Sequence, residues 1–455
     1  MRSRIDLTEG PIGRHLVNLT IPMFLGISSM IVASMIDTVY VGWIGTLELA
    51  AVSFTFPVVM AMATVSMGLG IGAASIIARV VGAGDEEKVR RLCTDALFLV
   101  AVLAVALSTL GLLMAEPLFE LLGARDDILP LSTAYMSVWF LGLPAFALPM
   151  VATSIMRSVG NARLPGIIMA SGAGLQVLIA PVLIFGIPGT WEGLGITGAA
   201  WSFVLSRLAM FGYTYRVLRK MQLLSFEIDR WAVHWASWKE ILRIGVPSMM
   251  SNLIGPVSMG IVVALLAGYG HEVVAGFGVA SRIESLATMV IMALSASTGP
   301  FIGQNWGARQ YARIYRAQSL GFRFSYLWSL FAFVVLAGAG RYLVGFINDD
   351  PAVIEATYAY LLLIPATYGF LGVGMVAGST FIALGKPMPT LVLSLVRMVV
   401  LFIPLALVMN EWFGYKGVFG AAAICNVVLG GLSFGWVRSM LRTEIARHGP
   451  QAGAA

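Results

Sequence analysis

Charged side chains are scarce in this sequence. Asp, Glu, Lys and Arg make up 11% of its 455 residues, whereas a soluble globular chain carries about 25%. Hydrophobic residues make up 58%, and a soluble fold of this length would need far more charge to stay dissolved. The composition therefore excludes a soluble enzyme and predicts an integral membrane protein.

Cysteine and histidine are also rare. The two cysteines, Cys93 and Cys425, are too few for a disulfide framework and lack the spacing of metal ligands. The four histidines fall at or outside the ends of apolar runs, and the chain contains no HExxH, GxSxG or Walker A motif. We therefore predict no enzymatic activity, no catalytic residue, no metal site and no cofactor, with energy drawn from an ion gradient.

Long apolar runs are abundant. Segments 97–113 and 392–408 are nearly continuous, without the alternation of a β-barrel. The predicted fold class is an all-α integral membrane protein of twelve transmembrane helices. Their approximate ranges are 14–43, 51–79, 92–115, 131–156, 165–187, 197–219, 240–268, 273–303, 319–343, 353–383, 390–410 and 417–440.

Basic residues concentrate on one side of these spans. Only Arg125, Arg341 and Lys416 fall in the loops of the opposite side, and Arg282 is the one basic residue assigned to the interior of a span. The positive-inside rule then predicts that both termini are cytoplasmic, in a bacterial inner (plasma) membrane. Because the basic residues are scattered over short loops, nucleic acid is not an expected partner.

The two halves of the chain match in one ungapped register, which places Pro22 on Pro247, Gly45 on Gly270, Gly82 on Gly307 and Gly160 on Gly385. This predicts an internal duplication with parallel repeats, namely an N-terminal six-helix bundle at 1–220 and a C-terminal six-helix bundle at 240–455. Residues 221–239 are predicted to form an interfacial amphipathic linker.

Asp37 is the only charged residue between His15 and Glu48, and it lies well inside the first predicted span. An ionised carboxylate near mid-membrane costs roughly 2.5–3.5 kcal/mol, which favours exchange of a proton or neutralisation by a cation. The alternative is a carboxylate that only fixes helix packing. Pro22 interrupts the same span about four turns earlier and is a candidate hinge.

Arg282 and Glu284 lie two residues apart in the eighth predicted span. They therefore point to different faces of the helix and cannot pair with each other directly. A second-half role in coupling or gating and a purely structural hydrogen bond both stay open.

Motifs along essentially the whole chain resemble those of the multidrug and toxic compound extrusion (MATE) family. They are LTEGPIGRHLVNLTIPMF (7–24), IDTVYVGWIGTLELAAVSFTFP (36–57), GLGIGAASIIARVVGAGDEEKVRR (68–91), VASRIESLATM (279–289) and PFIGQNWGAR (300–309). The resemblance implies twelve helices in two bundles with a V-shaped central cavity, and export of organic cations in exchange for protons or sodium. It also implies that Asp37 matches the first-helix aspartate that the family uses for cation coupling.

One bacterial branch of the family carries acidic residues in the seventh and tenth spans. The interiors of these spans lack one here, so the chain is more similar to the DinF-like branch of the family. It departs from that branch at three positions. Gln176 and Ala180 stand where the branch has Asn and Asp, and Phe203 stands where a Thr is expected.

A single carboxylate, Asp37, with Gln176, Ser202 and Tyr40 as candidate neighbours, is a poor sodium cage because a hard cation needs several oxygen ligands. It is a sufficient proton site. We therefore predict a proton-coupled multidrug exporter that works by alternating access as a monomer, with drugs or organic cations and membrane lipid as its partners. A sodium-coupled drug antiporter and a lipid-linked oligosaccharide flippase of the wider superfamily are the alternatives.

Overall fold

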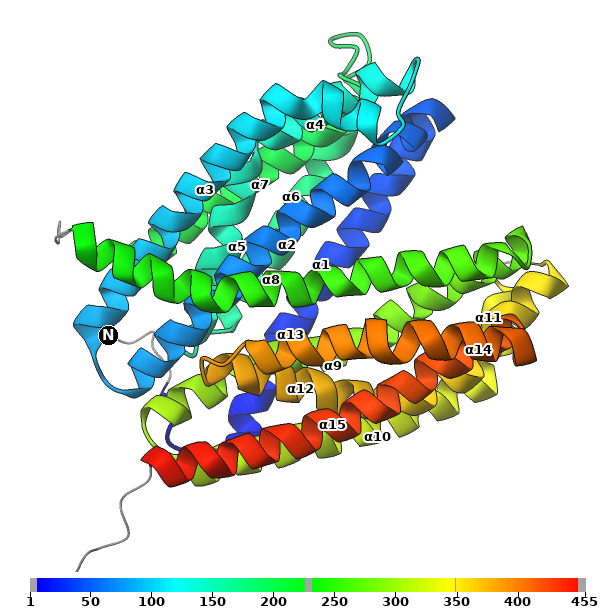
Figure 1. Cartoon of the computed structure of the whole chain (residues 1–455). Helices are drawn as coiled ribbons and strands as arrows, with labels where there is room; N and C mark the ends of the chain where they lie inside the picture. Colours follow the sequence, from blue (N-terminus) through cyan, green and yellow to red (C-terminus); the bar gives the residue numbers. More distant parts are fainter. Residues whose placement is uncertain (1–5, 226–230, 348, 449–455) are drawn as a thin grey trace, which may run out of the picture. The chain divides into compact units, whose positions relative to one another are not determined.

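The structure is a computed structural model of the chain and describes residues 6–225, 231–347 and 349–448. Within these residues the chain forms helices joined by turns, with one isolated β-bridge between Ile187 and Trp191. The predicted all-α class is confirmed. Figure 1 shows the helices, coloured along the chain from blue to red.

The first eight helices are α1 (Ile12–Ile44), α2 (Thr46–Gly82), α3 (Glu86–Leu121), α4 (Ile128–Leu141), α5 (Leu143–Ser158), α6 (Arg163–Phe185), α7 (Ile196–Lys220) and α8 (Trp231–Ala267). They are followed by α9 (His271–Gly307), α10 (Tyr311–Gly345), α11 (Pro351–Leu363), η1 (Pro365–Thr367), α12 (Tyr368–Ala383), α13 (Met388–Leu395), η2 (Val396–Phe402), α14 (Ile403–Phe413) and α15 (Tyr415–His448).

The membrane-spanning helices largely follow the prediction. In the described part of the chain, ten helices are long and apolar enough to cross a membrane, counting α11–α12 and α13–α14 as one span each. The pair α4–α5 makes an eleventh, bent by 49° at Gly142. The predicted span at 197–219 forms the helix α7, but α7 lies outside this set and carries four basic residues. Its status as the twelfth span stays a prediction.

Two other predicted spans are interrupted. The span at 353–383 changes to a 3₁₀ turn at Pro365, where the proline ring cannot continue the helical hydrogen bonding. The span at 390–410 contains a π-helical segment, η2. Such segments are rare and often mark functional sites.

The helices form two compact units. One contains Ile21–Met249, and the other contains Leu7–Thr20 together with Met250–Ala455. The division therefore falls inside α1, just before Pro22, and inside α8, just after Pro247. The predicted bundle limits at 220 and 240 and the V-shaped cavity between the bundles stay predictions.

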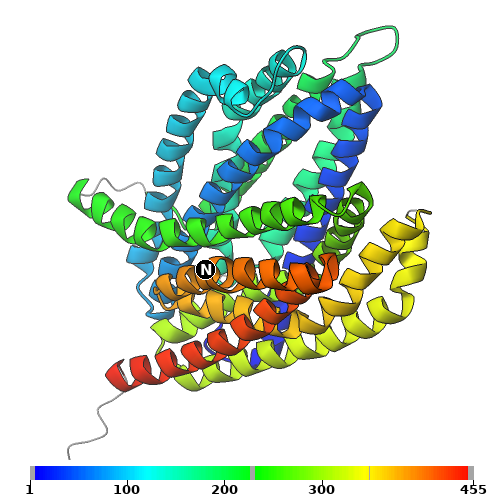
Figure 2. The same cartoon turned by 45° about the vertical axis from the view of Figure 1, so that its right-hand side comes forward.

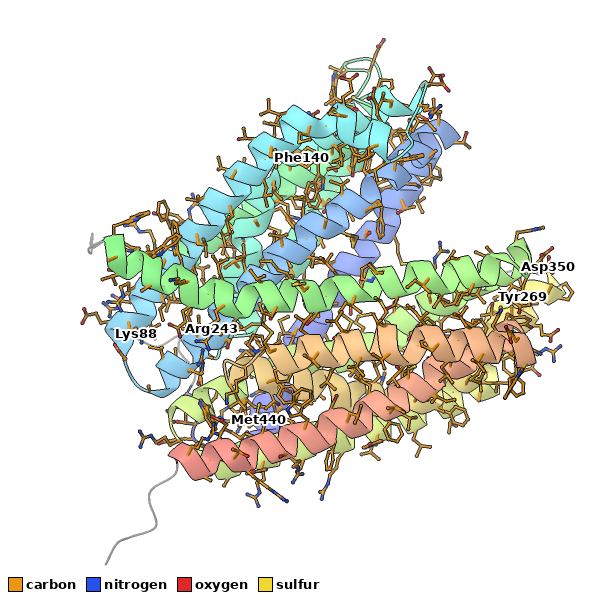
Figure 3. All side chains as sticks on the ribbon, in the orientation of Figure 1. Lys88, Phe140, Arg243, Tyr269, Asp350 and Met440 are labelled. Carbon is orange, nitrogen blue, oxygen red and sulfur yellow. The ribbon has the colours of Figure 1, made fainter. Side chains whose placement is uncertain are left out.

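Within the first unit, α2 packs along α5, α6 along α7, and α3 against both α4 and α5. Small residues allow the close approach of α3 to α4. A Cβ atom at Gly111 would lie 2.4 Å from the ring of Phe140, which Figure 3 labels. Ser108 donates a hydrogen bond of 2.7 Å to the Phe140 carbonyl.

Within the second unit, α12 packs along α9, α10 and α15, and α11 packs along α9 (Figure 2). An aromatic cluster fills the space between these helices. Tyr360 meets Phe419 edge-on at 5.0 Å between ring centroids, and Phe277 lies 5.7 Å from Tyr360. Contacts between these rings contribute to the van der Waals packing of the helices inside the unit.

The duplication is visible in the helix bounds. Both ends of α9 follow those of α2 at the spacing that separates Pro247 from Pro22. The turns after α5 and α12 repeat as well, since Gly160 and Gly385 both have positive φ, at 87° and 75°. The two halves therefore share backbone features as well as sequence.

The structure describes part of the predicted linker at 221–239. Residues 226–230 lie outside the described residues, and 231–239 form the first turns of α8, which continues without a break to Ala267. Trp238 is buried and donates to the carbonyl of Asp95 on α3 at 3.1 Å, while Trp231 and Trp235 are exposed. This stretch is thus the start of a long helix docked on α3. Its interfacial position stays a prediction.

Candidate functional site

Asp37 lies in the last third of α1, and its carboxylate turns toward α6 in the same unit. The side-chain amide of Gln176 donates a hydrogen bond to Oδ2. Oδ1 is buried and has no hydrogen-bond partner among the described residues. A buried carboxylate oxygen without a donor is unusual, so this oxygen is available to a proton or a cation.

Arg207 of α7 stands on the other side of Gln176. Its guanidinium donates to the Gln176 carbonyl oxygen at 3.4 Å, and only 6% of Arg207 is exposed. Because a guanidinium can only donate, Gln176 turns its oxygen to Arg207 and its NH₂ group to Asp37. The three side chains form one chain, in which a neutral amide separates a buried acid from a buried cation.

Aromatic and sulfur groups complete the surroundings of Arg207. The guanidinium lies 4.9 Å from the centroid of the Phe203 ring and 3.2 Å from the Met210 sulfur. Phe203 stacks in turn on Trp139 of α4, at 5.5 Å between centroids. Tyr135 of α4 lies within electrostatic range of Asp37. Four helices of the first unit therefore contribute to the site: α1, α4, α6 and α7.

Of the three predicted neighbours of Asp37, the structure brings one to it. Gln176 is in direct contact, whereas Ser202 is buried and donates to the Ala199 carbonyl of its own helix at 2.8 Å. Tyr40 packs against Trp43, with ring centroids 5.7 Å apart. Neither Ser202 nor Tyr40 hydrogen-bonds Asp37 within the described residues.

Pro22 lies at a close contact between α1 and α6. A Cβ atom on Gly166 of α6 would lie 2.5 Å from the Pro22 carbonyl oxygen, and a Cβ on Gly26 would lie 3.2 Å from the Gly166 Cα. Only glycine fits at Gly166 without a shift of one of the two backbones. This contact therefore holds α1 against α6 immediately after the division between the two units.

A second polar cluster lies in the second unit. Tyr360 of α11 donates to the Glu284 carboxylate of α9 at 2.5 Å. Arg397, in the π-helical segment η2, lies within electrostatic range of Glu284 and donates to Asn426 of α15 at 2.8 Å. Asn426 then donates to Thr367 at 2.9 Å. Each half of the duplicated fold thus holds one partly buried acid near an arginine, Arg207 in the first half and Arg397 in the second.

Arg282 is exposed on α9, and Glu284 faces Tyr360, so the two lie on different faces as predicted. The prediction that Arg282 is the one basic residue inside a span is wrong. Arg207 and Arg397 also lie inside helices, and both are shielded from solvent. A basic residue at the middle of a predicted span is the signal that identifies both of them.

Metal-ligating side chains form no cluster in the ranges that the structure describes. No group of three or more His, Cys, Asp or Glu side chains in these ranges is placed to hold a metal ion. The Asp37 cluster supplies one carboxylate, one amide and one cation.

A protein-family model matches each half of the duplicated chain. Residues 22–182 and 247–408 each match the sequence model of a family described as MatE. The two matches begin at the two prolines that the repeat aligns, Pro22 and Pro247.

Relatives match over nearly the whole chain. An FAD transporter of Shewanella oneidensis is 37% identical over 434 residues, which cover 94% of this chain and 95% of the relative. The probable multidrug resistance protein YpnP of Bacillus subtilis is 26% identical, covering 91% of this chain and 92% of the relative.

Solved structures share the fold. The Vibrio cholerae MATE transporter VcmN in the bent form superposes with a TM-score of 0.89 at 26% identity, covering 95% of this chain and 98% of that chain. The outward-facing conformation of a multidrug resistance MATE family transporter of the MOP superfamily gives a TM-score of 0.88 at 25% identity, with 96% and 97% of the two chains covered.

Proposed function

Because the chain belongs to the MatE family of membrane transporters, we propose that it exports small molecules in exchange for protons, with Asp37 as the proton-carrying group. The observation that carries this proposal is the buried Oδ1 of Asp37, which no described group satisfies. Protonation removes the charge that makes burial of a carboxylate unfavourable. The neighbouring Arg207 guanidinium attracts the ionised form, so the two states are in competition.

Proton coupling fits this cluster better than sodium coupling. Sodium needs several oxygen atoms around it, but Gln176 presents its NH₂ group to Asp37 and its oxygen to Arg207. A bound sodium ion would also sit near the positive charge of Arg207. A proton needs one free oxygen, which Asp37 Oδ1 provides.

The proposed movement is a change in the bend of α1. Pro22 lies two residues after the division between the units and fifteen before Asp37 on the same helix. Proline removes a backbone hydrogen bond and so lowers the resistance of a helix to bending. Protonation of Asp37 weakens its hold on Gln176 of α6 and lets this part of α1 move, which is the step that alternating access requires.

The second cluster is proposed to assist coupling or gating. Glu284 is held by Tyr360 and faces the charge of Arg397 in the π-helical segment. A change in the charge of Glu284 therefore acts on a helix segment with irregular hydrogen bonding. Arg282 is exposed on the same helix, and we propose that its charge takes part in gating.

The positive-inside distribution supports cytoplasmic termini in a bacterial inner membrane. One proton that moves inward across 100 mV releases about 2.3 kcal/mol, equal to a concentration ratio of about 50 for a neutral compound. One proton is therefore sufficient for useful export.

Drugs and organic cations are the first candidate substrates. The probable multidrug resistance protein YpnP and several multidrug export proteins named MepA are similar to this chain over more than nine tenths of its length, at 23–26% identity. We propose that this chain shares their substrate class, as its resemblance to the MATE family implied.

FAD or a similar dinucleotide is a second candidate, favoured by a specific observation. The Shewanella oneidensis FAD transporter is 37% identical to this chain. A dinucleotide carries a pyrophosphate, for which arginine is a preferred partner. The helices hold Arg207, which is buried, and Arg397, which is partly buried. An exporter of cations alone has less use for buried positive charge.

The test is transport by purified protein in proteoliposomes. Proton and sodium gradients are imposed separately, with a fluorescent organic cation or FAD enclosed as substrate. We expect export driven by the proton gradient alone. If only the sodium gradient drove export, the proton would not be the coupling ion. If the substrate were never concentrated beyond its equilibrium distribution, the protein would not be an active exporter. Comparison of the two substrates decides the substrate class.

A further inference from the structure

Four arginines lie on two helices of the second unit, and none of them belongs to the Glu284 cluster. Arg316 and Arg323 lie on α10, seven residues apart and so on one helix face. Arg438 and Arg442 lie on α15, four residues apart and also on one face. The two faces meet where Arg438 donates to Ser319 of α10 at 3.3 Å.

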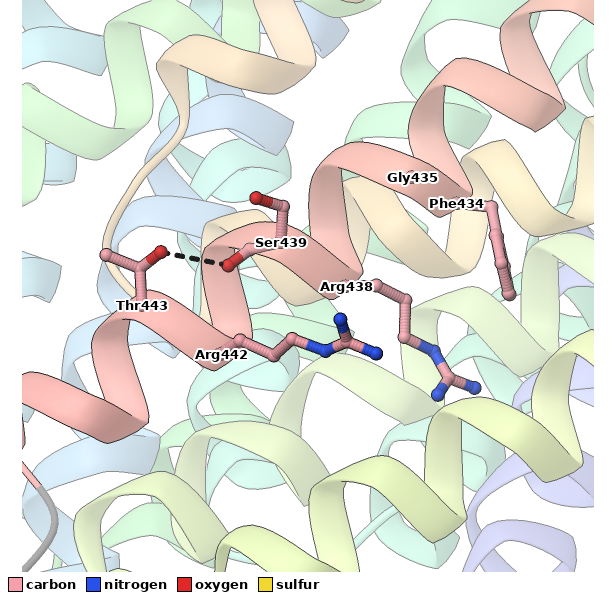
Figure 4. A pocket seen from close by; sticks show the side chains of 6 residues that line it. All are labelled: Phe434, Gly435, Arg438, Ser439, Arg442 and Thr443. Carbon is pink, nitrogen blue, oxygen red and sulfur yellow. Dashed lines mark hydrogen bonds between the residues drawn. The ribbon is translucent and has the colours of Figure 1, made fainter.

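Each partner of this hydrogen bond lines a pocket. The pocket at Arg438, of about 350 Å³, is lined by Phe434, Gly435, Arg438, Ser439, Arg442 and Thr443 (Figure 4). The pocket at Ser319, of about 540 Å³, is lined by Pro11, Ile12, Gly13, Arg316, Ser319, Leu320 and Arg323. The Arg438–Ser319 contact makes the two pockets neighbours, so the four arginines line one basic region that consists of two adjacent pockets.

Arg438 is held in place between aromatic rings. Its guanidinium lies 5.2 Å from the Phe434 ring centroid and 5.7 Å from that of Tyr315. Its Nε is buried and has no hydrogen-bond partner in the described ranges. Such cation–π contacts orient the guanidinium without neutralising its charge.

The positive charge of this region is not balanced by carboxylates of the described residues. Among these residues none of the four arginines forms an ion pair. The acid close by in sequence, Glu444, is paired with Lys386 at 2.5 Å and with Arg447 at 3.3 Å. The region therefore has an excess of positive charge and attracts an anion.

Apolar side chains continue from the arginines along the same helices. Leu320, Phe324 and Leu327 follow Arg316 on one face of α10, and Leu327 is 68% exposed. On α15 the exposed Leu432 and Phe434 precede Arg438. A ligand with a negative head group and long apolar chains matches this arrangement of a basic region beside apolar side chains, whereas a free phosphate would contact only the basic region.

We propose that the basic region on α10 and α15, made by Arg316, Arg323, Arg438 and Arg442, binds the phosphodiester head group of an anionic phospholipid. Basic pockets between transmembrane helices at the cytoplasmic surface recognise such head groups. The acyl chains lie along Leu320, Phe324 and Leu327. The proposal concerns lipid recognition and is independent of the transported substrate and the coupling ion.

The test is a count of bound lipids by native mass spectrometry on the full-length protein in detergent. Phosphatidylglycerol and phosphatidylcholine with identical acyl chains are titrated separately. We expect tighter binding of phosphatidylglycerol. The double variant Arg438→Gln/Arg442→Gln should weaken its binding about 30-fold, from the free energy that two basic residues contribute at an anionic surface.

A matched control removes the same charge elsewhere. Arg216→Gln/Arg219→Gln changes two exposed arginines near the end of α7 and should leave the affinity unchanged. Arg442→Lys keeps the charge and should retain binding, which separates loss of charge from loss of folding. Equal binding of the two lipids, or an equal loss in both double variants, would overturn the site. Displacement by inorganic phosphate at lipid-like concentrations would overturn its assignment to a lipid.

Discussion

Asp37→Asn is the most informative single change because it replaces the carboxylate by a group of almost the same size. The amide oxygen of the new side chain still accepts from Gln176, which donates to Oδ2 in the structure. What disappears is the negative charge near Arg207 and the oxygen that takes up a proton. Loss of a hydrogen bond to a charged group costs about 1.5–3 kcal/mol, but the substitution also removes the unfavourable burial of a charge. We therefore expect the free energy of unfolding to change by less than this amount.

The expected effect on transport is larger than the effect on folding. With one proton exchanged per neutral substrate molecule, the unchanged protein should build a concentration ratio of about 50 at 100 mV. In Asp37→Asn the ratio should fall to about 1, because the amide that replaces the carboxylate does not take up the proton. The substrate can still cross by facilitated exchange, so the initial equilibration rate is a separate measurement.

The assay uses proteoliposomes in which the membrane potential and the pH difference are set independently. Glu120→Gln is the control, since Glu120 is an exposed carboxylate near the end of α3, and it should keep the full ratio. If Asp37→Asn still accumulated substrate against its gradient to the same extent, Asp37 would not be the coupling group. If Glu120→Gln failed as well, the loss would be a general effect of charge.

Three further changes test the packing and the electrostatics. Gly166→Ala should lower the thermal unfolding midpoint by an amount equivalent to about 1–3 kcal/mol, because the new Cβ would lie 2.5 Å from a carbonyl oxygen of α1. The control is Gly174→Ala on the same helix, where a Cβ would have nothing within 4 Å. An equal shift in both variants would contradict the close contact. Arg207→Met removes the cation that attracts the ionised carboxylate, so the pH of half-maximal efflux should rise, and an unchanged pH profile would show that the arginine is electrostatically inactive. Glu284→Gln removes the carboxylate that accepts from Tyr360 and lies within electrostatic range of Arg397, and it should lower thermal stability. Glu355→Gln alters an exposed ion pair and should not; equal effects of the two changes would contradict this distinction.

Hydropathy was sufficient for most of the fold because a membrane span must satisfy its own backbone hydrogen bonds, and so must be a long apolar helix. The same rule gives little information about breaks within a span. The bend at Gly142, the 3₁₀ turn at Pro365 and the π-helical segment at Val396–Phe402 each depend on how neighbouring helices accept the irregular backbone. Sequence predicted one span in each place.

Asp37 could be identified from the sequence because an isolated acid in an apolar run has few structural reasons to exist. Its partners could not all be identified in this way. Gln176 was predicted on family resemblance and is in contact, but Ser202 donates to its own helix and Tyr40 packs on Trp43. Arg207 lies far from Asp37 in the sequence, and hydropathy has no means to place it next to Gln176.

The amino-acid sequence alone determined the membrane location, the helical class, the duplication and the position of the buried acid. These depend on composition and on local periodicity, which are properties of the chain itself. Tertiary structure decided which side chains meet: an arginine behind Gln176, a second acid and arginine on α9 and η2, and four arginines along α10 and α15. These side-chain contacts depend on the rotation of each helix about its own axis. That rotation is determined by the packing of the helix against its neighbours.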